Sequence, residues 1–157
     1  MEQLSFREFL DEDLQLYQQW LEQDYVVRWY KNPQDWINEV KNRESEFRFV
    51  HHLIVLQEDK KIGFCQYYEY KYGGEEWHNN IELEGTYSID YLIGDKAYLG
   101  RGYGREIIRF LTKHIFETTK AVRIIVKPED ENAASIHALL SAGYEYDKSN
   151  DLYIISR

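Results

Sequence analysis

Gly100-Arg101-Gly102-Tyr103-Gly104-Arg105 joins two segments with different patterns. Residues 86–93 before it are rich in β-formers. After it, apolar side chains recur at helical spacing, at Ile107, Ile108, Leu111 and Ile115. Glycines let a backbone approach a ligand closely, amides at a helix start attract phosphate, and arginines pair well with phosphate oxygens. The stretch therefore indicates a pyrophosphate-binding loop, while glycine-rich turns before helices also occur for packing alone.

Two common phosphate-binding loops do not fit this stretch. A Walker loop requires Gly-Lys followed by Ser or Thr, whereas Gly104 is followed by Arg105-Glu106. A dinucleotide-binding fold places its glycines after the first strand and continues with several alternating strands and helices. Here only about fifty residues follow the loop. The loop belongs to another kind of fold.

Length and composition predict one globular domain over residues 1–157. Hydrophobic residues make up 43% and aromatic residues 16%, which argues against disorder. Apolar runs are short, so we expect no membrane span and no secretory signal. The single cysteine, Cys65, excludes an internal disulfide and is typical of a core position. These features predict a cytoplasmic protein.

The formal net charge is −9. This charge disfavours nucleic acid as a partner and favours cationic small molecules or proteins, although solubility alone explains it equally well. His51 and His52 are adjacent on an expected strand, so their side chains face opposite sides. The other histidines are scattered, and we expect no metal site.

The order of the expected elements gives the fold class. Asp11 is a plausible N-cap for a first helix, and Pro33 suits the start of a second. Strands are expected near residues 4–9, 47–57, 62–70, 86–93, 122–126, 144–146 and 152–155, with further helices after the glycine loop and over residues 132–140. This order predicts an α+β fold with a mixed, mostly antiparallel central sheet flanked by helices.

Two blocks of sequence resemble the GCN5-related N-acetyltransferase (GNAT) superfamily. Its acetyl-CoA motif is Gln or Arg followed by Gly-x-Gly-x-Gly or Ala, and here Leu99 departs at the first position of Leu99–Gly104. About 25 residues later, Pro128 through Asn132 to Ala142-Gly143-Tyr144 resembles the superfamily's second block. Trp20-Leu21, Val27-x-Trp29-Tyr30 and Ile89–Gly94 are most like aminoglycoside 6'-N-acetyltransferases. Membership would make antibiotic resistance a possible consequence of the activity.

The resemblance implies acetyl-CoA as co-substrate and assigns its contacts. Backbone groups of Leu92 and Ile93 would bind the pantetheine arm. Asn132 would contact the CoA arm, or serve only as a helix N-cap. The pyrophosphate would bind the loop amides of Arg101, Gly102, Tyr103, Gly104 and Arg105.

The resemblance also implies an acceptor site around Asp90, which would bind the substrate ammonium and act as base. From Glu69 to Asp90 there are six carboxylates and one lysine, a setting that suits a cationic amine or a merely solvated loop. Glu75, Glu76 and Trp77 are candidate substrate contacts in this stretch. Trp29 and Tyr30 are further candidates, with core packing an equal alternative.

Two departures from the resemblance bear on substrate and rate. Lys127-Pro128 stands where aminoglycoside enzymes of this kind carry Asp-Pro, and a lysine would repel an ammonium. Leu139 stands where the superfamily often has a tyrosine acid, which leaves water or Tyr144 to protonate the thiolate. The alternatives are acetylation of a protein amino group or an amine metabolite, and a non-catalytic acyl-CoA-binding module.

Overall fold

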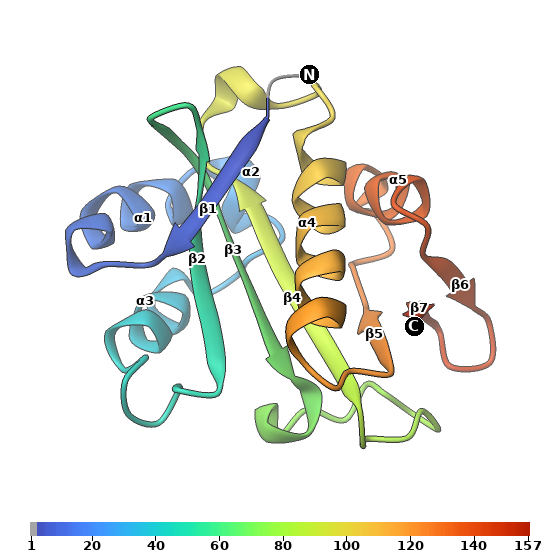
Figure 1. Cartoon of the computed structure of the whole chain (residues 1–157). Helices are drawn as coiled ribbons and strands as arrows, with labels where there is room; N and C mark the ends of the chain where they lie inside the picture. The colour runs from blue at the N-terminus through green and yellow to red at the C-terminus, as the bar shows by residue number, and fades with distance from the viewer. Residues whose placement is uncertain (1–2) are drawn as a thin grey trace. The chain divides into compact units, whose positions relative to one another are not determined.

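The computed structural model describes residues 3–157, which build a seven-stranded sheet in the order β1-β2-β3-β4-β5-β7-β6 (Figure 1). The strands are β1 (Leu4–Glu8), β2 (Val50–Gln57), β3 (Lys60–Glu69), β4 (Thr86–Ile93), β5 (Arg123–Val126), β6 (Glu145–Asp147) and β7 (Leu152–Ser156). β4 pairs with β5 in parallel, whereas β1 with β2, β5 with β7, and β6 with β7 are antiparallel. The expected mixed, mostly antiparallel α+β fold is confirmed.

The α-helices are α1 (Leu14–Leu21), α2 (Asp24–Val27), α3 (Pro33–Lys41), α4 (Tyr103–Thr118) and α5 (Ala133–Ser141). The described residues also form three short 3-10 helices: η1 (Asp11–Asp13) between β1 and α1, η2 (Tyr70–Gly73) between β3 and β4, and η3 (Lys96–Tyr98) between β4 and α4. Among the described residues, none of these helices is long and apolar enough to cross a membrane.

Two local expectations were wrong, and one short helix was missed. Asp11 is not the N-cap of α1, because Asp11–Asp13 form η1 and Asp13 precedes the helix. The strand expected from residue 47 begins at Val50, since residues 42–49 form turns. The four-residue helix α2 was not predicted.

The chain divides into two compact units, and each is described by itself. The first comprises Met1–Gln66 and Tyr91–Tyr103, and the second comprises Tyr67–Asp90 and Gly104–Arg157. The expectation of one domain stays a prediction.

The first unit has an aromatic core. Tyr17 and Trp20 of α1 pack with Phe64 of β3, and the Tyr17 and Phe64 ring centroids are 4.3 Å apart. Val26 of α2 and Ile37 of α3 belong to the same buried cluster. In Figure 1, α1 and α3 lie to the left of β2, and α2 lies behind the strands. The core therefore fixes α1 and α2 against the strands of this unit.

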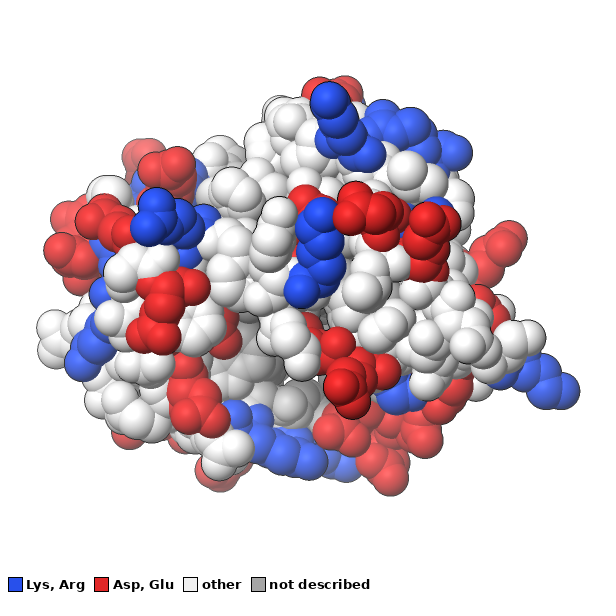
Figure 2. Space-filling model, turned by 90° about the horizontal axis from the view of Figure 1, so that it is seen from below, with Lys and Arg blue, Asp and Glu red and all other residues white. Residues whose placement is uncertain are grey.

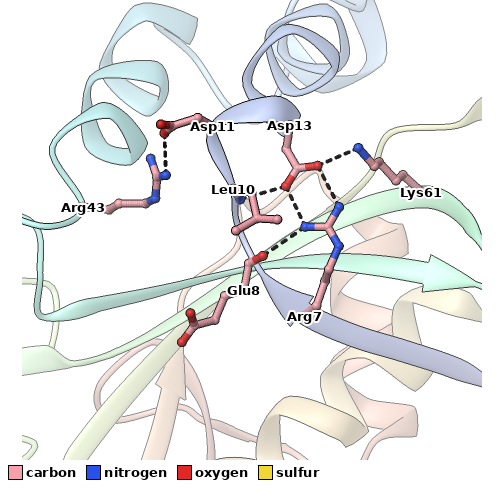
Figure 3. A network of polar contacts seen from close by, with 7 residues as sticks. All are labelled: Arg7, Glu8, Leu10, Asp11, Asp13, Arg43 and Lys61. Carbon is pink, nitrogen blue, oxygen red and sulfur yellow. Dashed lines mark hydrogen bonds and ion pairs between the residues drawn. The ribbon is translucent and has the colours of Figure 1, made fainter.

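A buried carboxylate ties β1, η1 and β3 together in the same unit (Figure 3). The Asp13 side chain is fully buried; its oxygens accept from Arg7 at 2.8 and 2.9 Å and lie 2.7 Å from Lys61 Nζ. The backbone N–H of Leu10 also donates to Asp13, at 2.8 Å. Burial alone would raise the pKa of Asp13, but the hydrogen bonds from Arg7, Lys61 and Leu10 outweigh it and hold that pKa well below its usual range.

The second unit has a smaller core of its own. Tyr70, Ile125 and Leu152 form a fully buried cluster. The Ser88 hydroxyl of β4 donates to the carbonyl of Ile125 in β5 at 2.7 Å, which joins the two parallel strands. These contacts fix β4, the strand that carries the candidate acceptor residue Asp90.

Charged side chains on the face drawn in Figure 2 are of mixed sign. Acidic groups gather in several places, with basic groups between them. On this face, acidic and basic side chains are thus interspersed.

Candidate active site

The end of β4 packs closely on α1. A Cβ added at Gly94 would lie 2.0 Å from the ring of Trp20, a distance that side-chain rearrangement of a buried tryptophan does not relieve. The N–H of Gly94 donates to the carbonyl of Ile62 at 2.8 Å. Glycine at 94 is therefore required by packing, and it fixes where the chain leaves β4.

Three polar side chains hold the backbone of this strand end. The Tyr25 hydroxyl donates to the carbonyl oxygen of Ile93 at 2.7 Å. Gln23 Nε2 donates to the carbonyl of Gly94 at 2.8 Å. The Tyr30 hydroxyl donates to the carbonyl of Tyr91 and accepts from its N–H at 3.2 Å. Tyr30, a predicted substrate contact, thus positions the strand that bears Asp90.

The two residues predicted to bind the pantetheine arm differ in what their carbonyls face. The carbonyl oxygen of Leu92 faces Gly63 of β3, where an added Cβ would come within 2.5 Å of it. The carbonyl oxygen of Ile93 accepts a hydrogen bond from the Tyr25 hydroxyl. The pantetheine contacts of both residues stay predictions.

The glycine loop follows η3. Gly100 and Gly102 have φ of 70° and 84°, which strongly favour glycine. The Arg101 guanidinium lies 5.1 Å from the ring centroid of Tyr98 and 5.5 Å from that of Tyr103, and its Nη1 donates to the carbonyl of Ala97 at 3.1 Å. Arg101 is exposed, and none of its contacts within the described chain is to a carboxylate. Its charge remains available to a phosphate.

At the start of α4, the structure leaves room at Gly104. A Cβ there would touch only Ala138 Cβ, at 3.9 Å, and φ is not positive, so neither packing nor backbone conformation requires glycine. Arg105 Nε lies 3.5 Å from Glu106 Oε1 and is buried without a hydrogen-bond partner among the described residues. An anion held close to the backbone would account for both features.

Asn132 is the N-cap of α5. Its Oδ1 accepts from the N–H of Ser135 at 3.2 Å, so the capping alternative is confirmed. The amide nitrogen makes no contact among those described and can still donate to a ligand.

Three predicted acceptor residues come together in the second unit around Tyr68 of β3. The Tyr68 hydroxyl donates to Glu75 Oε1 at 2.7 Å, and Trp77 Nε1 donates to Glu75 Oε2 at 3.0 Å. Burial, followed by the charges of Asp90 and Glu75, raises the pKa of Tyr68 well above its usual value. One carboxylate therefore binds this buried phenol directly and the charge of a second acts on it, an arrangement that suits an ammonium group.

The remaining carboxylates of this stretch are arranged differently. Lys71 Nζ lies 2.8 Å from Glu84 and 3.3 Å from Glu69, which neutralises part of the acidic loop. Glu76 is exposed. In the first unit, the predicted contact Trp29 is partly buried under Arg28, whose guanidinium lies 4.6 Å from the ring centroid.

The structure shows the surroundings of Lys127 and Leu139, the two residues that depart from the pattern of the superfamily. Lys127 Nζ lies 2.8 Å from Asp151 Oδ2, so it is not an isolated cation. Leu139 is fully buried. The Tyr144 hydroxyl is buried and lies 2.8 Å from Thr112 Oγ1, so Tyr144 is a core residue and is not placed to act as an acid. No group of described residues that could hold a metal ion was found.

Tyr68 and Asp151 were not among the residues predicted from the sequence. Tyr68 occurs in an aromatic run, Tyr67-Tyr68-Glu69-Tyr70, where spacing does not single out one ring. Asp151 meets Lys127, which lies 24 positions earlier in the chain, only because β7 pairs with β5.

The fold, the glycine loop before α4 and the capped α5 define the family. The model of the "Acetyltransferase (GNAT) domain" family matches residues 9–152. The chain belongs to the GNAT acetyltransferases.

Similar proteins of this family include named enzymes. Aminoglycoside N(6')-acetyltransferase type 1 of Klebsiella pneumoniae is 24% identical over 152 residues, which span 90% of this chain and 74% of that protein. The match to the Serratia marcescens protein of the same name has the same values. A solved structure of AAC(6')-Ib with paromomycin and acetyl-CoA has a TM-score of 0.83 at 21% identity, over 99% of this chain and 94% of that one. At this identity the structural likeness shows the fold alone.

Proposed function

We propose that the chain transfers the acetyl group of acetyl-CoA to a primary amine of a small cationic molecule, with Asp90 as the residue that binds the ammonium and takes its proton. The observation that carries this proposal is the buried Tyr68 hydroxyl, which donates to Glu75 at 2.7 Å and whose pKa is raised by burial and by the charges of Asp90 and Glu75. Asp90 lies on the strand that leads to the glycine loop, so donor and acceptor functions share one strand.

Acetyl-CoA is the donor that the loop supports. The amides from Arg101 to Arg105 hold the pyrophosphate, the unfilled space at Gly104 admits it, and the guanidinium groups of Arg101 and Arg105 neutralise it. The amide nitrogen of Asn132 contacts the CoA arm. Solved structures of AAC(6')-Ib with CoA or acetyl-CoA support this role for the fold.

The chemistry requires the loss of two protons from the nitrogen and one displacement. Asp90 takes a proton from the ammonium, directly or through water, and the free amine attacks the thioester carbonyl carbon. The new N–C bond forms, the C–S bond breaks, and the CoA thiolate leaves. The nitrogen then loses its second proton, which water carries to the thiolate, because Leu139 has no proton to give and the Tyr144 hydroxyl lies in the core against Thr112. Most of the remaining rate enhancement comes from holding the two substrates in the orientation that the reaction requires.

The 6'-amine of an aminoglycoside is the acceptor that we favour. The curated relatives are aminoglycoside N(6')-acetyltransferases, and solved AAC(6')-Ib complexes contain paromomycin and kanamycin. In this chain, Glu75 is fixed by Tyr68 and Trp77, and the charges of Glu75 and Asp90 both act on Tyr68; two such carboxylates suit an acceptor with several ammonium groups.

Acetyl-CoA turnover with a panel of kanamycin, polyamines and lysine peptides tests this proposal. We expect acetylated kanamycin, identified by mass spectrometry as the singly acetylated product. Acetylation of peptides alone would place the acceptor among protein amino groups. Binding of acetyl-CoA without turnover on any amine would make the chain a non-catalytic acyl-CoA-binding module and overturn the proposal. Thermal stabilisation by acetyl-CoA is the preliminary check on donor binding.

A further inference from the structure

Asn150 lies in the turn between β6 and β7, and each of its polar atoms forms a hydrogen bond. Two of these bonds stay within the turn. The backbone N–H donates to Asp147 Oδ1 at 3.1 Å, and Nδ2 donates to Asp147 Oδ2 at 2.9 Å. The residue is buried, with 9% of its surface exposed. The turn therefore fixes the orientation of the Asn150 side chain and leaves its two oxygens to contact another segment.

The two oxygens of Asn150 bind the loop of residues 74–85, which joins η2 to β4. Asn79 Nδ2 donates to the Asn150 carbonyl oxygen at 2.7 Å, and the backbone N–H of Asn80 donates to Asn150 Oδ1 at 2.9 Å. Asn79 has a φ of 52°, a left-handed conformation that asparagine adopts more readily than most residues. We call these two hydrogen bonds the Asn150 clasp.

The loop that the Asn150 clasp holds carries the predicted acceptor contacts Glu75 and Trp77. Trp77 Nε1 donates to Glu75 Oε2 at 3.0 Å, and the Trp77 ring packs edge-on against Tyr70 with the ring centroids 4.9 Å apart. The backbone N–H of His78 donates to the hydroxyl of Tyr70, which is fully buried. Tyr70 and Asn150 therefore hold the loop at neighbouring points, close in sequence to the exposed carboxylate of Glu75.

The clasp bears on affinity because this loop is long and irregular. Residues 74–85 are turns and irregular backbone, a kind of segment that loses conformational entropy when a ligand orders it. A loop that is already tied to the β6–β7 turn has lost part of this freedom before the ligand binds. The tie therefore lowers the free-energy cost of placing the Glu75 carboxylate against an ammonium group.

We propose that Asn150 is a positioning residue for the acceptor: it ties the loop of residues 74–85 to the β6–β7 turn and so holds Glu75 where it meets a cationic amine. This inference rests on the proposed function, in which Glu75 is one of the carboxylates that bind the acceptor. Asn150 acts through Asn79 and the backbone of Asn80, and not by contact with the substrate.

Two variants open the clasp from opposite sides. Asn150→Ala removes Oδ1, which accepts from Asn80, and Nδ2, which donates to Asp147. Asn79→Gly removes the donor to the Asn150 carbonyl and keeps a residue that favours positive φ. Asn80→Ala is the matched control, because it keeps the N–H that donates to Asn150. Melting temperatures check folding, and Asn79→Gly, which changes an exposed residue, carries the test if Asn150→Ala unfolds.

Hydrogen–deuterium exchange of the peptide that covers residues 74–85 measures whether the clasp holds the loop. We expect faster exchange in Asn150→Ala and Asn79→Gly, and the wild-type rate in Asn80→Ala. An unchanged rate in both clasp variants overturns the proposal, because the loop would then be held without Asn150.

Calorimetric titration with kanamycin measures the effect on the acceptor. We expect its Kd to rise about three- to tenfold in both clasp variants and to stay within about twofold in Asn80→Ala. The Kd for acetyl-CoA stays unchanged in all of them. In a Glu75→Gln background, opening the clasp should change the kanamycin Kd by less than about twofold, because the carboxylate that the clasp positions is then absent. A turn that is merely destabilised would give the same factor in both backgrounds.

Equal kanamycin affinity in the wild type and both clasp variants overturns the proposal, as does the same factor with and without the Glu75 carboxylate. Absence of kanamycin binding by the wild type at millimolar concentration overturns it as well. Acetyl transfer to kanamycin is measured separately on the same proteins. The predicted loss of affinity without acetylation of kanamycin would contradict the proposed function and support this inference, and acetylation with equal affinities would do the reverse.

Discussion

Asp13→Asn is the substitution whose effect on stability the structure defines most clearly. It keeps the volume of the side chain and removes the charge that Arg7 and Lys61 share. Removing one partner of a buried ion pair costs about 3–5 kcal/mol. Here the Arg7 and Lys61 side chains are each 30% exposed and regain some hydration, so we expect a loss of about 2–4 kcal/mol. For a chain of this length that corresponds to a fall of about 5–15 °C in Tm.

Thermal unfolding followed by circular dichroism measures this loss. Asp11→Asn is the matched control, because Asp11 also meets an arginine, Arg43 at 2.6 Å, but its side chain is 96% exposed (Figure 3). We expect the control to change Tm by about 1 °C or less. A fall in Asp11→Asn as large as that in Asp13→Asn, or no fall in either, would refute the reasoning.

The same network predicts a pH dependence. Hydrogen bonds from Arg7, Lys61 and Leu10 hold the pKa of Asp13 below its value in the unfolded chain. The resulting stability is fully present above about pH 4 and is lost as the pH falls further. The Tm difference between wild type and Asp13→Asn should therefore be constant from about pH 5 to 8 and narrow below about pH 4. A difference that widens in acid would contradict the sign of the shift.

Three further substitutions test other parts of the structure. Gly94→Ala places a Cβ against the Trp20 ring and should lower Tm by about 5 °C or more, whereas a change below about 1 °C would show that α1 can move away. Gly104→Ala meets only Ala138, so Tm should stay within about 2 °C while the Kd for acetyl-CoA, measured by calorimetry, rises; unchanged affinity would remove this glycine from the donor site. Tyr68→Phe removes the donor to Glu75 and should raise the acceptor KM about three- to tenfold with the acetyl-CoA KM unchanged, and an unchanged acceptor KM would exclude Tyr68 from positioning the carboxylate.

Elements with strong local signals could be predicted from the sequence. The β-rich run of residues 86–93 is β4 with the same bounds, and Pro33 is the first residue of α3. Asp11 was misassigned as a cap because an acidic residue before an apolar run suits several positions of a helix start. Asp13 is the buried carboxylate at this helix start, and it binds side chains from β1 and β3. No local sequence pattern indicates these contacts.

For the site, too, features that depend on local sequence could be predicted, whereas contacts between distant segments could not. The glycine loop could be read from spacing, because its conformation depends on its own residues. The charge of Lys127 was read correctly, but its effect depends on Asp151, which only the pairing of β5 with β7 brings near. Glu75 and Trp77 were named as acceptor contacts, yet Tyr68, the residue that binds Glu75 and lies near Asp90, was not.

The central claim is that Asp90 takes the proton from an amine acceptor. Steady-state acetylation by wild type and Asp90→Asn tests it most directly, with Glu117→Gln, an exposed carboxylate on α4, as the matched control. We predict that kcat falls at least about tenfold in Asp90→Asn while the Kd for acetyl-CoA and the kcat of the control stay unchanged. Equal kcat in the wild type and Asp90→Asn would contradict the account.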